Sequence, residues 1–496
     1  MISQLRTVSV RTRVFAVLAV LAGTLFVFPQ IVGAVVTENP RRDLPIALDG
    51  EVWAVEQVGD FVVVGGNFTQ VQISRDGPIV DQAAIFAYHL DSGTFLDSFR
   101  PIIGRNNDNL PEIRSIVPTP DNTGLYIGGA FNSVDDRTDG NVRIRDRIAL
   151  LELATGRLDR NFSRSGLNAQ VNDLAIGADG SLYAGGNFTV VLDLAPDRPA
   201  IQQAVRGLAR FDPVTAAFDP GFRYESHVDI GRPEETANPD SPRVFGVSRL
   251  AFSETGAELF VAHRGAELRD VASGIVYDSP GVAKIRIFDD GSHTGNDFKL
   301  LYVDPEDPIQ DFYHAGQCDG RGLQIRDMQV ADGFVYTVQQ GGDNGPQCDT
   351  TVKFSVENGE KRPTWVSRAF DSILAIEVVD ELVYIGGHFR ALVNDTAPSP
   401  YPGAFLLQNG GNEYTYDGET VAFGGGQAYD ADPELNTNRL ASVRFHEDLV
   451  DTGFVTEINQ WGVLDANTPG SPTRTSILAR THRSVFWRLL PSTVAC

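Results

Sequence analysis

Cysteine is the first scarcity in this sequence, which holds three cysteines among 496 residues. None of them belongs to a Cys-x-x-Cys pair or lies beside a pair of histidines, which argues against a zinc site. Cys318 and Cys348 lie in loops rich in Gly and Asp, where we predict a disulfide that pins one loop to the other. Cys496, the last residue, is left over.

Positively charged residues are also scarce. The chain has 41 Lys and Arg against 65 Asp and Glu, which gives a formal net charge of −24. Such a surface repels phosphates, and no basic stripe offsets it, so we expect no binding to nucleic acid. An acidic surface does keep an exported protein soluble.

Catalytic motifs are absent from the sequence. None of the eight histidines stands in His-Glu-x-x-His, and there is no Gly-x-Ser-x-Gly and no glycine-rich phosphate loop. We therefore predict no catalytic residue and no organic cofactor. Calcium is the one cofactor left open, because three loops are rich in carboxylates, although none has the spacing of a known calcium loop. These loops are 139–146, 304–311 and 341–349.

The N-terminus has the pattern of an export signal. Three arginines precede an apolar run from Val14 to Val32, and small residues end that run. This predicts a signal peptide over 1–34. An uncleaved anchor is the alternative, since the run nearly reaches the ~20 residues that span a bilayer. No later segment is apolar enough to span, so we expect a secreted or cell-surface protein whose only membrane contact would be this segment.

What the chain does have is a repeat. The segments "VVVGGNF", "LYIGGAF", "LYAGGNF" and "VYIGGHF" each place a double glycine and a phenylalanine behind a β-type run. Two weaker copies carry Ala262-His263 and Val338-Gln339 in place of the glycines. The shared residues of the four clear copies are Gly65, Gly66, Phe68, Gly128, Gly129, Phe131, Gly185, Gly186, Phe188, Gly386, Gly387 and Phe389.

A second pattern follows each copy after a variable loop, as in "RIALLELATGRLDRNF". It places a tight turn between two β-type segments, so each unit is predicted to be a meander of four strands. Six such units predict an all-β fold, a β-propeller of six four-stranded blades over 35–461. A collapsed seventh blade in the long segment before Arg439 is the alternative. Residues 462–496 form a C-terminal tail, and its docking on the propeller is left open.

The glycines are predicted to be structural. Successive side chains of a strand point to opposite faces, so Gly65 and Gly66 remove one side chain from each face and let neighbouring segments approach closely. The phenylalanines are expected to wedge between adjacent blades, where aromatic burial is large. A second set ends the units and is expected to do the same: Phe99, Phe162, Phe222, Phe298, Trp365 and Phe454.

The two patterns together resemble the delta-sixty repeat of secreted bacterial β-propellers, and the propeller region of a fungal cell-polarity protein is similar. The resemblance covers about 45–460; it is clear in units one, two, three and six and weak in units four and five. It implies the propeller fold and an extracellular setting. It supplies no general catalytic motif, so it implies no active-site residue.

The leading hypothesis is a non-catalytic binding or scaffold module for a protein or glycan partner, which we expect to be a monomer. Its contact surface is expected among long loops rich in Asp, Asn, Gly and Pro. The rival is a propeller enzyme acting on carbohydrate, which predicts that His, Arg and carboxylate side chains converge at one mouth of the channel. The longest loops are 70–84, 132–146, 190–206, 224–246, 303–322, 341–350 and 393–438.

Overall fold

The computed structural model describes the chain from Asp43 to Val455, with gaps. The predicted signal peptide, the C-terminal tail, Cys318 and Cys348 lie outside the described residues. The gaps are 106–108, 163–164, 195–198, 230–245, 264, 280, 299–300, 303–309, 312–323, 341–349, 360, 370–372, 380–381, 388–391, 395–412, 417–418, 423–439 and 445–449.

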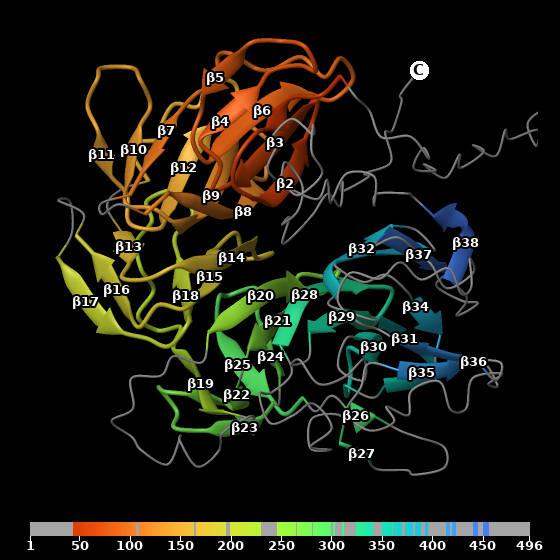
Figure 1. Cartoon of the computed structure of the whole chain (residues 1–496). Helices are drawn as coiled ribbons and strands as arrows, with labels where there is room; N and C mark the ends of the chain where they lie inside the picture. Colours follow the sequence, from red (N-terminus) through yellow and green to blue (C-terminus); the bar gives the residue numbers. More distant parts are fainter. Residues whose placement is uncertain are drawn as a thin grey trace, which may run out of the picture. The chain divides into compact units, whose positions relative to one another are not determined.

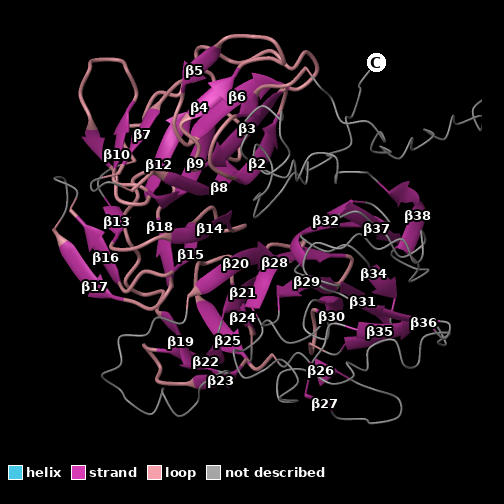
Figure 2. Cartoon of the chain, viewed as in Figure 1, coloured by secondary structure: helices cyan, strands magenta, loops and turns pink. Residues whose placement is uncertain are grey.

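All the regular secondary structure of the described residues is β-strand, so the prediction of an all-β fold is confirmed (Figure 2). The sequence explains this, because Val, Ile, Tyr and Phe alternate with small residues between tight Gly-containing turns. Among the described residues, no helix has the length and apolar character needed to cross a membrane.

Six antiparallel sheets, which we call main sheets 1 to 6, follow one another in the described chain (Figure 1). Sheets 1 to 3 consist of β2 (Val52–Val58), β3 (Phe61–Gly66) and β6 (Ile85–His89); β8 (Glu112–Pro118), β9 (Gly124–Ala130) and β12 (Ile148–Glu152); and β14 (Val171–Ile176), β15 (Leu182–Gly186) and β18 (Leu208–Phe211). Sheet 4 consists of β20 (Val247–Phe252), β21 (Glu258–His263), β24 (Val282–Ile287) and β25 (His293–Asn296).

Sheet 5 consists of β28 (Gln324–Ala331), β29 (Phe334–Gln340), β30 (Thr350–Ser355), β31 (Lys361–Ala369) and β34 (Leu392–Asn394). Sheet 6 consists of β32 (Ile373–Val379), β33 (Leu382–Gly387), β37 (Leu440–Arg444) and β38 (Val450–Val455).

The prediction of four strands per sheet is wrong for sheet 5, which has five strands, and for sheets 1 to 3. Sheets 1 to 3 each have three strands, and the predicted fourth strand is reduced to a single bridge. The tight turn after the third strand is closed by these bridges, which pair Tyr88 with Phe95, Leu151 with Leu158, and Phe211 with Phe218. The short segment beyond each bridge then leaves the sheet, because its Asp and Phe serve a turn and the core rather than a ladder.

Several predicted loops are in fact small second sheets, which we call accessory sheets. In each of units one to four, the chain leaves the second strand of the main sheet, forms a hairpin, and pairs with the strand that precedes the unit's first strand. These sheets are β1 (Ile46–Ala47), β4 (Gln70–Gln72) and β5 (Ile79–Asp81); β7 (Ile102–Gly104), β10 (Ser133–Asp135) and β11 (Arg143–Ile144); β13 (Ser165–Leu167), β16 (Val190–Asp193) and β17 (Ile201–Ala204); and β19 (Tyr224–Asp229), β22 (Gly265–Asp270) and β23 (Val276–Asp278).

Two short hairpins complete the described strands: β26 (Leu301–Tyr302) with β27 (Gln310–Asp311), and β35 (Glu413–Tyr416) with β36 (Glu419–Ala422). The variable segments are therefore partly ordered by pairing.

The first strands of successive main sheets pack against one another in chain order, from β2 through β8, β14, β20 and β28 to β32. Four apolar clusters lie between successive sheets, and each of these four joins residues of two units. One such cluster joins Val63 of sheet 1 to Ile113 and Ile127 of sheet 2. Closure of this series into a ring of six or seven blades stays a prediction.

Candidate functional site on the first strands

A β-bulge occurs at the same place in all six main sheets of the described chain. The pairing between the first and second strands skips one residue near the start of the first strand, directly opposite the glycine pair or, in sheets 4 and 5, opposite Ala262-His263 and Val338-Gln339. Bulges re-aim a side chain and are common beside functional sites. We call the six skipped residues the bulge row: Trp53, Arg114, Asn172, Ser248, Arg326 and Leu374.

The second glycine of each pair makes room for the backbone just before the bulge. A Cβ atom on Gly186 would lie 2.2 Å from the carbonyl oxygen of Gln170. Gly66 and Gly129 face the equivalent carbonyls of Glu51 and Glu112 at 2.0 and 1.9 Å. No side chain fits there without a shift of the backbone, so the double glycine and the bulge are one structural unit.

The first glycine makes room for the next sheet instead. A Cβ atom on Gly185 would lie 2.5 Å from Cγ1 of Val247, which stands on the first strand of sheet 4. Gly65 and Gly128 have the same relation to Ile113 and Val171 on the next first strands, at 2.7 and 2.8 Å. The described glycines thus provide clearance on both faces of the second strand. Gly386 pairs with Ala375 and Gly387 with Ile373 in the same register in sheet 6.

The phenylalanines of the repeat are buried. Phe131 and Phe188 lie in clusters that span two successive sheets, whereas Phe68 lies in a cluster made of unit-one residues. Of the second set, Phe99, Phe162, Phe222 and Phe298 have no exposed surface and belong to the clusters that face the next unit. Phe389 lies outside the described residues, and the side chains of Trp365 and Phe454 are not described.

The residues that follow the bulges form a second repeated feature, which was not predicted from the sequence. On the six first strands these residues are Ala54, Ser115, Asp173, Arg249, Asp327 and Ala375, and we call them the latch column. A first strand is the edge of its own sheet, so its outward N–H groups have no strand partner and need another acceptor.

The latch column supplies that acceptor from the preceding sheet. The N–H of Leu174 donates to Oγ of Ser115 at 3.0 Å, and the N–H of Leu250 donates to Asp173 at 3.0 Å. The hydroxyl of Ser115 also donates to Asp173, at 3.0 Å. These bonds join sheets 2, 3 and 4 along their first strands.

Sheet 4 breaks the pattern because Arg249 cannot accept a hydrogen bond. Its Nε donates to Asp327 of sheet 5 at 2.7 Å, and Asp327 accepts the N–H of Met328 on its own strand at 3.1 Å. The other oxygen of Asp327 accepts the N–H of Ile376 of sheet 6 at 3.1 Å. A cation between two carboxylates therefore continues the chain of contacts from sheet 3 to sheet 6.

Burial raises the pKa of Asp173 and of Asp327, although the side chain of Asp327 keeps 22% of its surface exposed. The charge of Arg249 lowers both pKa values, but it offsets only part of this effect. The arrangement matches the Arg and carboxylate part of the rival enzyme hypothesis. However, the oxygens of both carboxylates already accept bonds from neighbouring backbone N–H groups, which makes them connectors between sheets.

His263 takes the second glycine position in sheet 4, and its ring is inserted between the main sheet and the accessory sheet. Nδ1 lies 2.7 Å from Oγ of Ser226 on β19 and accepts the N–H of Gly265 at 3.2 Å. Nε2 lies 2.9 Å from the carbonyl oxygen of Ser279, so the neutral ring donates there and accepts at Nδ1. Burial lowers the pKa of His263 to about 4. Its role is to tie two sheets together.

Members of the bulge row also bridge sheets. The guanidinium carbon of Arg114 lies 4.0 Å from the ring centroid of Trp53, a cation–π contact between sheets 1 and 2. Glu112 holds Arg114 in place by accepting from Nε and Nη2 at 2.9 and 2.7 Å. Asn172 donates from Nδ2 to the carbonyl oxygen of Val247 at 2.8 Å. Trp53, Arg114, Asn172 and Ser248 keep partial exposure, and Arg326 is exposed.

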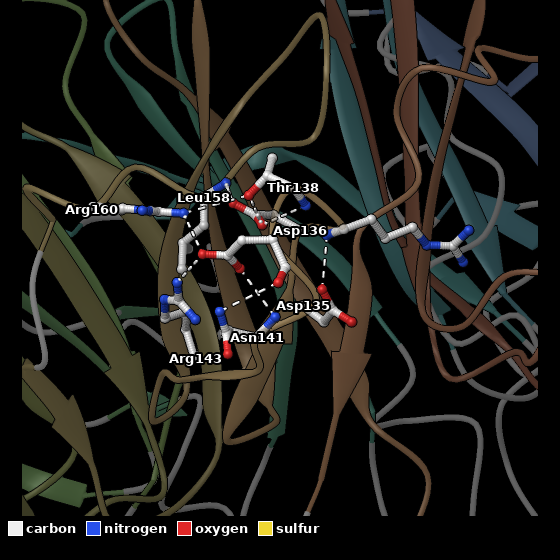
Figure 3. Close-up of polar contacts among 9 residues, drawn as sticks. Asp135, Asp136, Thr138, Asn141, Arg143, Leu158 and Arg160 are labelled. Atoms are coloured by element: carbon white, nitrogen blue, oxygen red, sulfur yellow. Dashed lines mark hydrogen bonds and ion pairs between the residues drawn. The ribbon is translucent and has the colours of Figure 1, made fainter.

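The first predicted calcium loop, 139–146, begins in the turn between β10 and β11 and continues through β11. Asp136, which precedes this loop in the same turn, accepts from the backbone N–H of Leu158 at 3.1 Å, and Asp139 pairs with Arg143 and Arg160 (Figure 3). A backbone hydrogen bond from Asn141 helps to hold the pKa of Asp139 at about 2. These carboxylates are neutralised by arginines and N–H groups of the protein itself.

Within the described residues, no group of three His, Cys, Asp or Glu side chains is placed to hold a metal ion. Of the other two predicted calcium loops, 341–349 lies outside the described residues, and of 304–311 only Gln310 and Asp311 are described, as β27. Calcium therefore stays a prediction for those segments.

The comparison with known proteins is sparse. No protein-family model matches the chain, and no curated protein matches it. Among solved structures, the chain is similar to the β-propeller domain of Cps50 (Swd1) from Myceliophteria thermophila. The two share 12% identity with a TM-score of 0.32, over 68% of this chain and 94% of that one.

Proposed function

We propose that this protein is an exported or cell-surface β-propeller that binds a protein or glycan partner and does not catalyse a reaction. The support is a repeat of six main sheets in the described chain whose first strands pack in series, together with the export pattern of 1–34. The resemblance to the delta-sixty repeat proteins points the same way.

One observation carries the binding role. The bulge places one side chain per sheet at the same register, and the five that keep exposed surface differ in chemistry: aromatic, cationic, amide and hydroxyl. The sixth, Leu374, is buried. A repeated backbone feature that holds non-repeated side chains is what a contact surface requires, since the scaffold fixes positions and the residues set specificity. Trp53 and Arg114 are the residue types that dominate contact energies.

The same region lacks the arrangement that acid–base catalysis requires. A general acid or base must reach a substrate proton, yet the carboxylates of Asp173 and Asp327 are held by backbone N–H groups of the next sheets. His263 is likewise enclosed by Ser226 and Ser279. Asp173, Arg249, Asp327 and His263 are therefore used in joining sheets.

The test is a binding screen with the exported chain on a glycan array and in pull-downs from its own cell surface, followed by two matched variants. Trp53→Ala removes a ring that an arginine covers in the bulge row. Phe288→Ala removes a ring covered by Arg286, 5.2 Å from the ring centroid, away from the row and 39% exposed.

We expect Trp53→Ala to weaken binding by tenfold or more and Phe288→Ala to leave the affinity unchanged. Equal losses in both variants would remove the bulge row from the contact surface. Turnover of a sugar or ester substrate that disappears in Asp173→Asn, in a chain that remains folded, would replace the proposal by the enzyme alternative.

A further inference from the structure

One position of the repeat carries an unexpected residue in unit two. Just before the third strand of each of units one to four, one residue forms the same two backbone hydrogen bonds. Its carbonyl oxygen accepts from the second glycine position, and its N–H donates to the carbonyl two residues further along. All four residues have a left-handed backbone, with φ between 64° and 78°, which favours glycine. They are Ala84, Arg147, Gly207 and Gly281.

Unit two thus keeps an arginine where the backbone disfavours a long side chain. In unit three, a Cβ atom on Gly207 would also lie 2.9 Å from the carbonyl oxygen of Gly186. The guanidinium of Arg147 donates from Nη1 to the carbonyl oxygen of Phe131. Units one, three and four hold the same backbone without such a side-chain bond, so the fold does not require it. Strained positions of this kind cluster at ligand sites.

A second arginine lies beside the first. Arg105 follows β7, whose last residue accepts the N–H of Asn132 at 3.0 Å, and Arg147 donates to the neighbouring carbonyl of Phe131. Burial lowers the pKa of Arg147, the charge of Asp146 raises it, and the nearby charge of Arg105 lowers it again. Two guanidinium groups so close repel each other, and an anion between them would stabilise both.

Glu112 is shared between two arginines. Its Oε1 accepts from Nη1 of Arg105 at 3.4 Å, and its Oε2 accepts from Nη2 of Arg114 at 2.7 Å. Nη1 of Arg105 also donates to the carbonyl oxygen of Leu110 at 3.3 Å. In the described part of the chain, Arg105 and Arg147 reach their hydrogen-bond partners through Nη1, which leaves Nε and Nη2 of both groups for a ligand. We call Arg105, Arg114 and Arg147 the arginine group.

The arginine group is continuous with the bulge row. Its member Arg114, held by Glu112, covers the ring of Trp53 at 4.0 Å. The side chains of Arg105 and Arg114 keep 22% and 24% of their surface exposed, so a ligand on the bulge row can reach them. Three arginines here face two carboxylates, those of Glu112 and Asp146, in a chain whose formal net charge is −24.

We propose that the arginine group is a subsite for a carboxylate, and that the ligand of the bulge row is a glycan that carries uronic acid. The inference rests on the proposed function and specifies the ligand of the same surface. A planar guanidinium matches the two oxygens of a carboxylate, and charge-assisted hydrogen bonds of this kind are stronger than neutral ones.

The neighbouring side chains favour a sugar as the carrier of that carboxylate. Trp53 supplies an aromatic ring, which is apolar on its faces. Nε2 of Gln170 donates to Oδ1 of Asn172 at 2.7 Å, so amide groups that can bind hydroxyls continue the row in unit three. The net charge of −24 repels densely charged polymers over long range. Spaced carboxylates on a sugar chain therefore fit this surface better than a heavily sulfated glycan does.

The test is isothermal titration calorimetry of the exported chain with oligosaccharides of hyaluronan, alginate and polygalacturonate, each paired with its own carboxyl-reduced form. Wild type is expected to bind the acidic form of at least one pair about tenfold more tightly than the reduced form. Arg105→Gln and Arg147→Gly are expected to abolish this preference and to leave the affinity for the reduced form unchanged. The matched control is Arg143→Gln, which removes the same charge from an arginine paired with Asp139 and should keep the preference.

Arg147→Gly also separates binding from folding, because it gives unit two the residue of units three and four. Its urea midpoint is expected to equal or exceed that of wild type, so a lost preference would come from the missing guanidinium. The carboxylate subsite is refuted if the preference survives both variants, or if Arg143→Gln abolishes it equally.

The failure of this inference differs from that of the proposed function. Binding that depends on Trp53 but shows no preference for any acidic form would refute the carboxylate subsite and leave the bulge row as the contact surface. Binding of acidic forms that depends on Arg105 and is unchanged in Trp53→Ala would support the subsite and remove the bulge row from the contact surface.

Discussion

Gly185→Ala is the sharpest probe of how the sheets are joined. The added Cβ atom meets Cγ1 of Val247 at 2.5 Å, and the next contacts are Cγ of Leu250 at 3.2 Å and Cβ of Val247 at 3.3 Å. One methyl group of the next sheet thus causes nearly all of the overlap. Overpacking of this kind costs ~1–3 kcal/mol of unfolding free energy.

A second substitution can remove that overlap. Val247→Ala alone leaves a cavity and costs about 2 kcal/mol or more. In the double variant the methyl group added at Gly185 occupies part of that space. The loss of unfolding free energy in the double variant is therefore expected to be ~1–2 kcal/mol smaller than the sum of the two single losses. Gly186→Ala gives the contrast, because its Cβ would lie 2.2 Å from the backbone oxygen of Gln170, which no side-chain substitution removes.

The assay is urea unfolding of each variant and of a control, Gly221→Ala. The nearest atom to a Cβ on Gly221 is a carboxylate oxygen of Asp219 at 3.1 Å and the next lies at 4.0 Å, so the control should shift the unfolding free energy by no more than ~0.5 kcal/mol. The reasoning fails if Gly185→Ala is as mild as this control, or if Val247→Ala rescues Gly186→Ala as well as it rescues Gly185→Ala.

Three further predictions concern the polar contacts. The folded-state pKa of His263, about 4, lies below the ordinary value of 6.5. The neutral ring therefore stabilises the fold above pH 6.5, by at most ~3 kcal/mol, and this contribution is lost as the pH falls toward 4. Urea midpoints of wild type and His263→Gln should therefore converge between pH 7 and pH 5, and a constant difference would contradict the assignment. Arg249→Met should lower the unfolding free energy at pH 7 by ~3–5 kcal/mol because it leaves buried carboxylates unpaired, and adding Asp327→Asn should recover part of the loss; no recovery would show that their contact is incidental. Ser115→Ala should cost ~1–2 kcal/mol in urea unfolding, since the N–H of Leu174 loses its acceptor, and an unchanged midpoint would remove Ser115 from the latch column.

The repeat was predictable from sequence because it is local. The glycine pairs, the tight turns and the alternating apolar residues identify the first three strands of each unit, and the structure confirms the all-β class. The fourth strand was overestimated in units one to three, where pairing beyond Tyr88 and its equivalents stops after one bridge. The accessory sheets were missed because their strands are two to six residues long and pair across the main sheet's sequence.

The connecting residues could not be predicted in the same way. Asp173, Arg249 and Asp327 have no motif, and each looks like a polar residue near the start of a strand. The signal that could have found them is the register of the hairpin. The latch residue is the one that pairs with the first glycine position of the second strand, and it can be located by counting across the hairpin once the bulge is known. The bulge itself has no fixed residue type, as Trp53 and Ser248 show.

The sequence by itself determined the unit: a hairpin closed by a tight turn, a glycine pair that allows close approach, and a phenylalanine for the core. These depend on backbone freedom and on the alternation of side chains, which are properties of neighbouring residues. The tertiary structure alone decided that the second glycine faces a backbone carbonyl, that the first faces the next sheet, and that a serine, two aspartates and an arginine join the first strands. Those roles arise where separate units meet, because an edge N–H or a buried carboxylate finds its partner on another sheet.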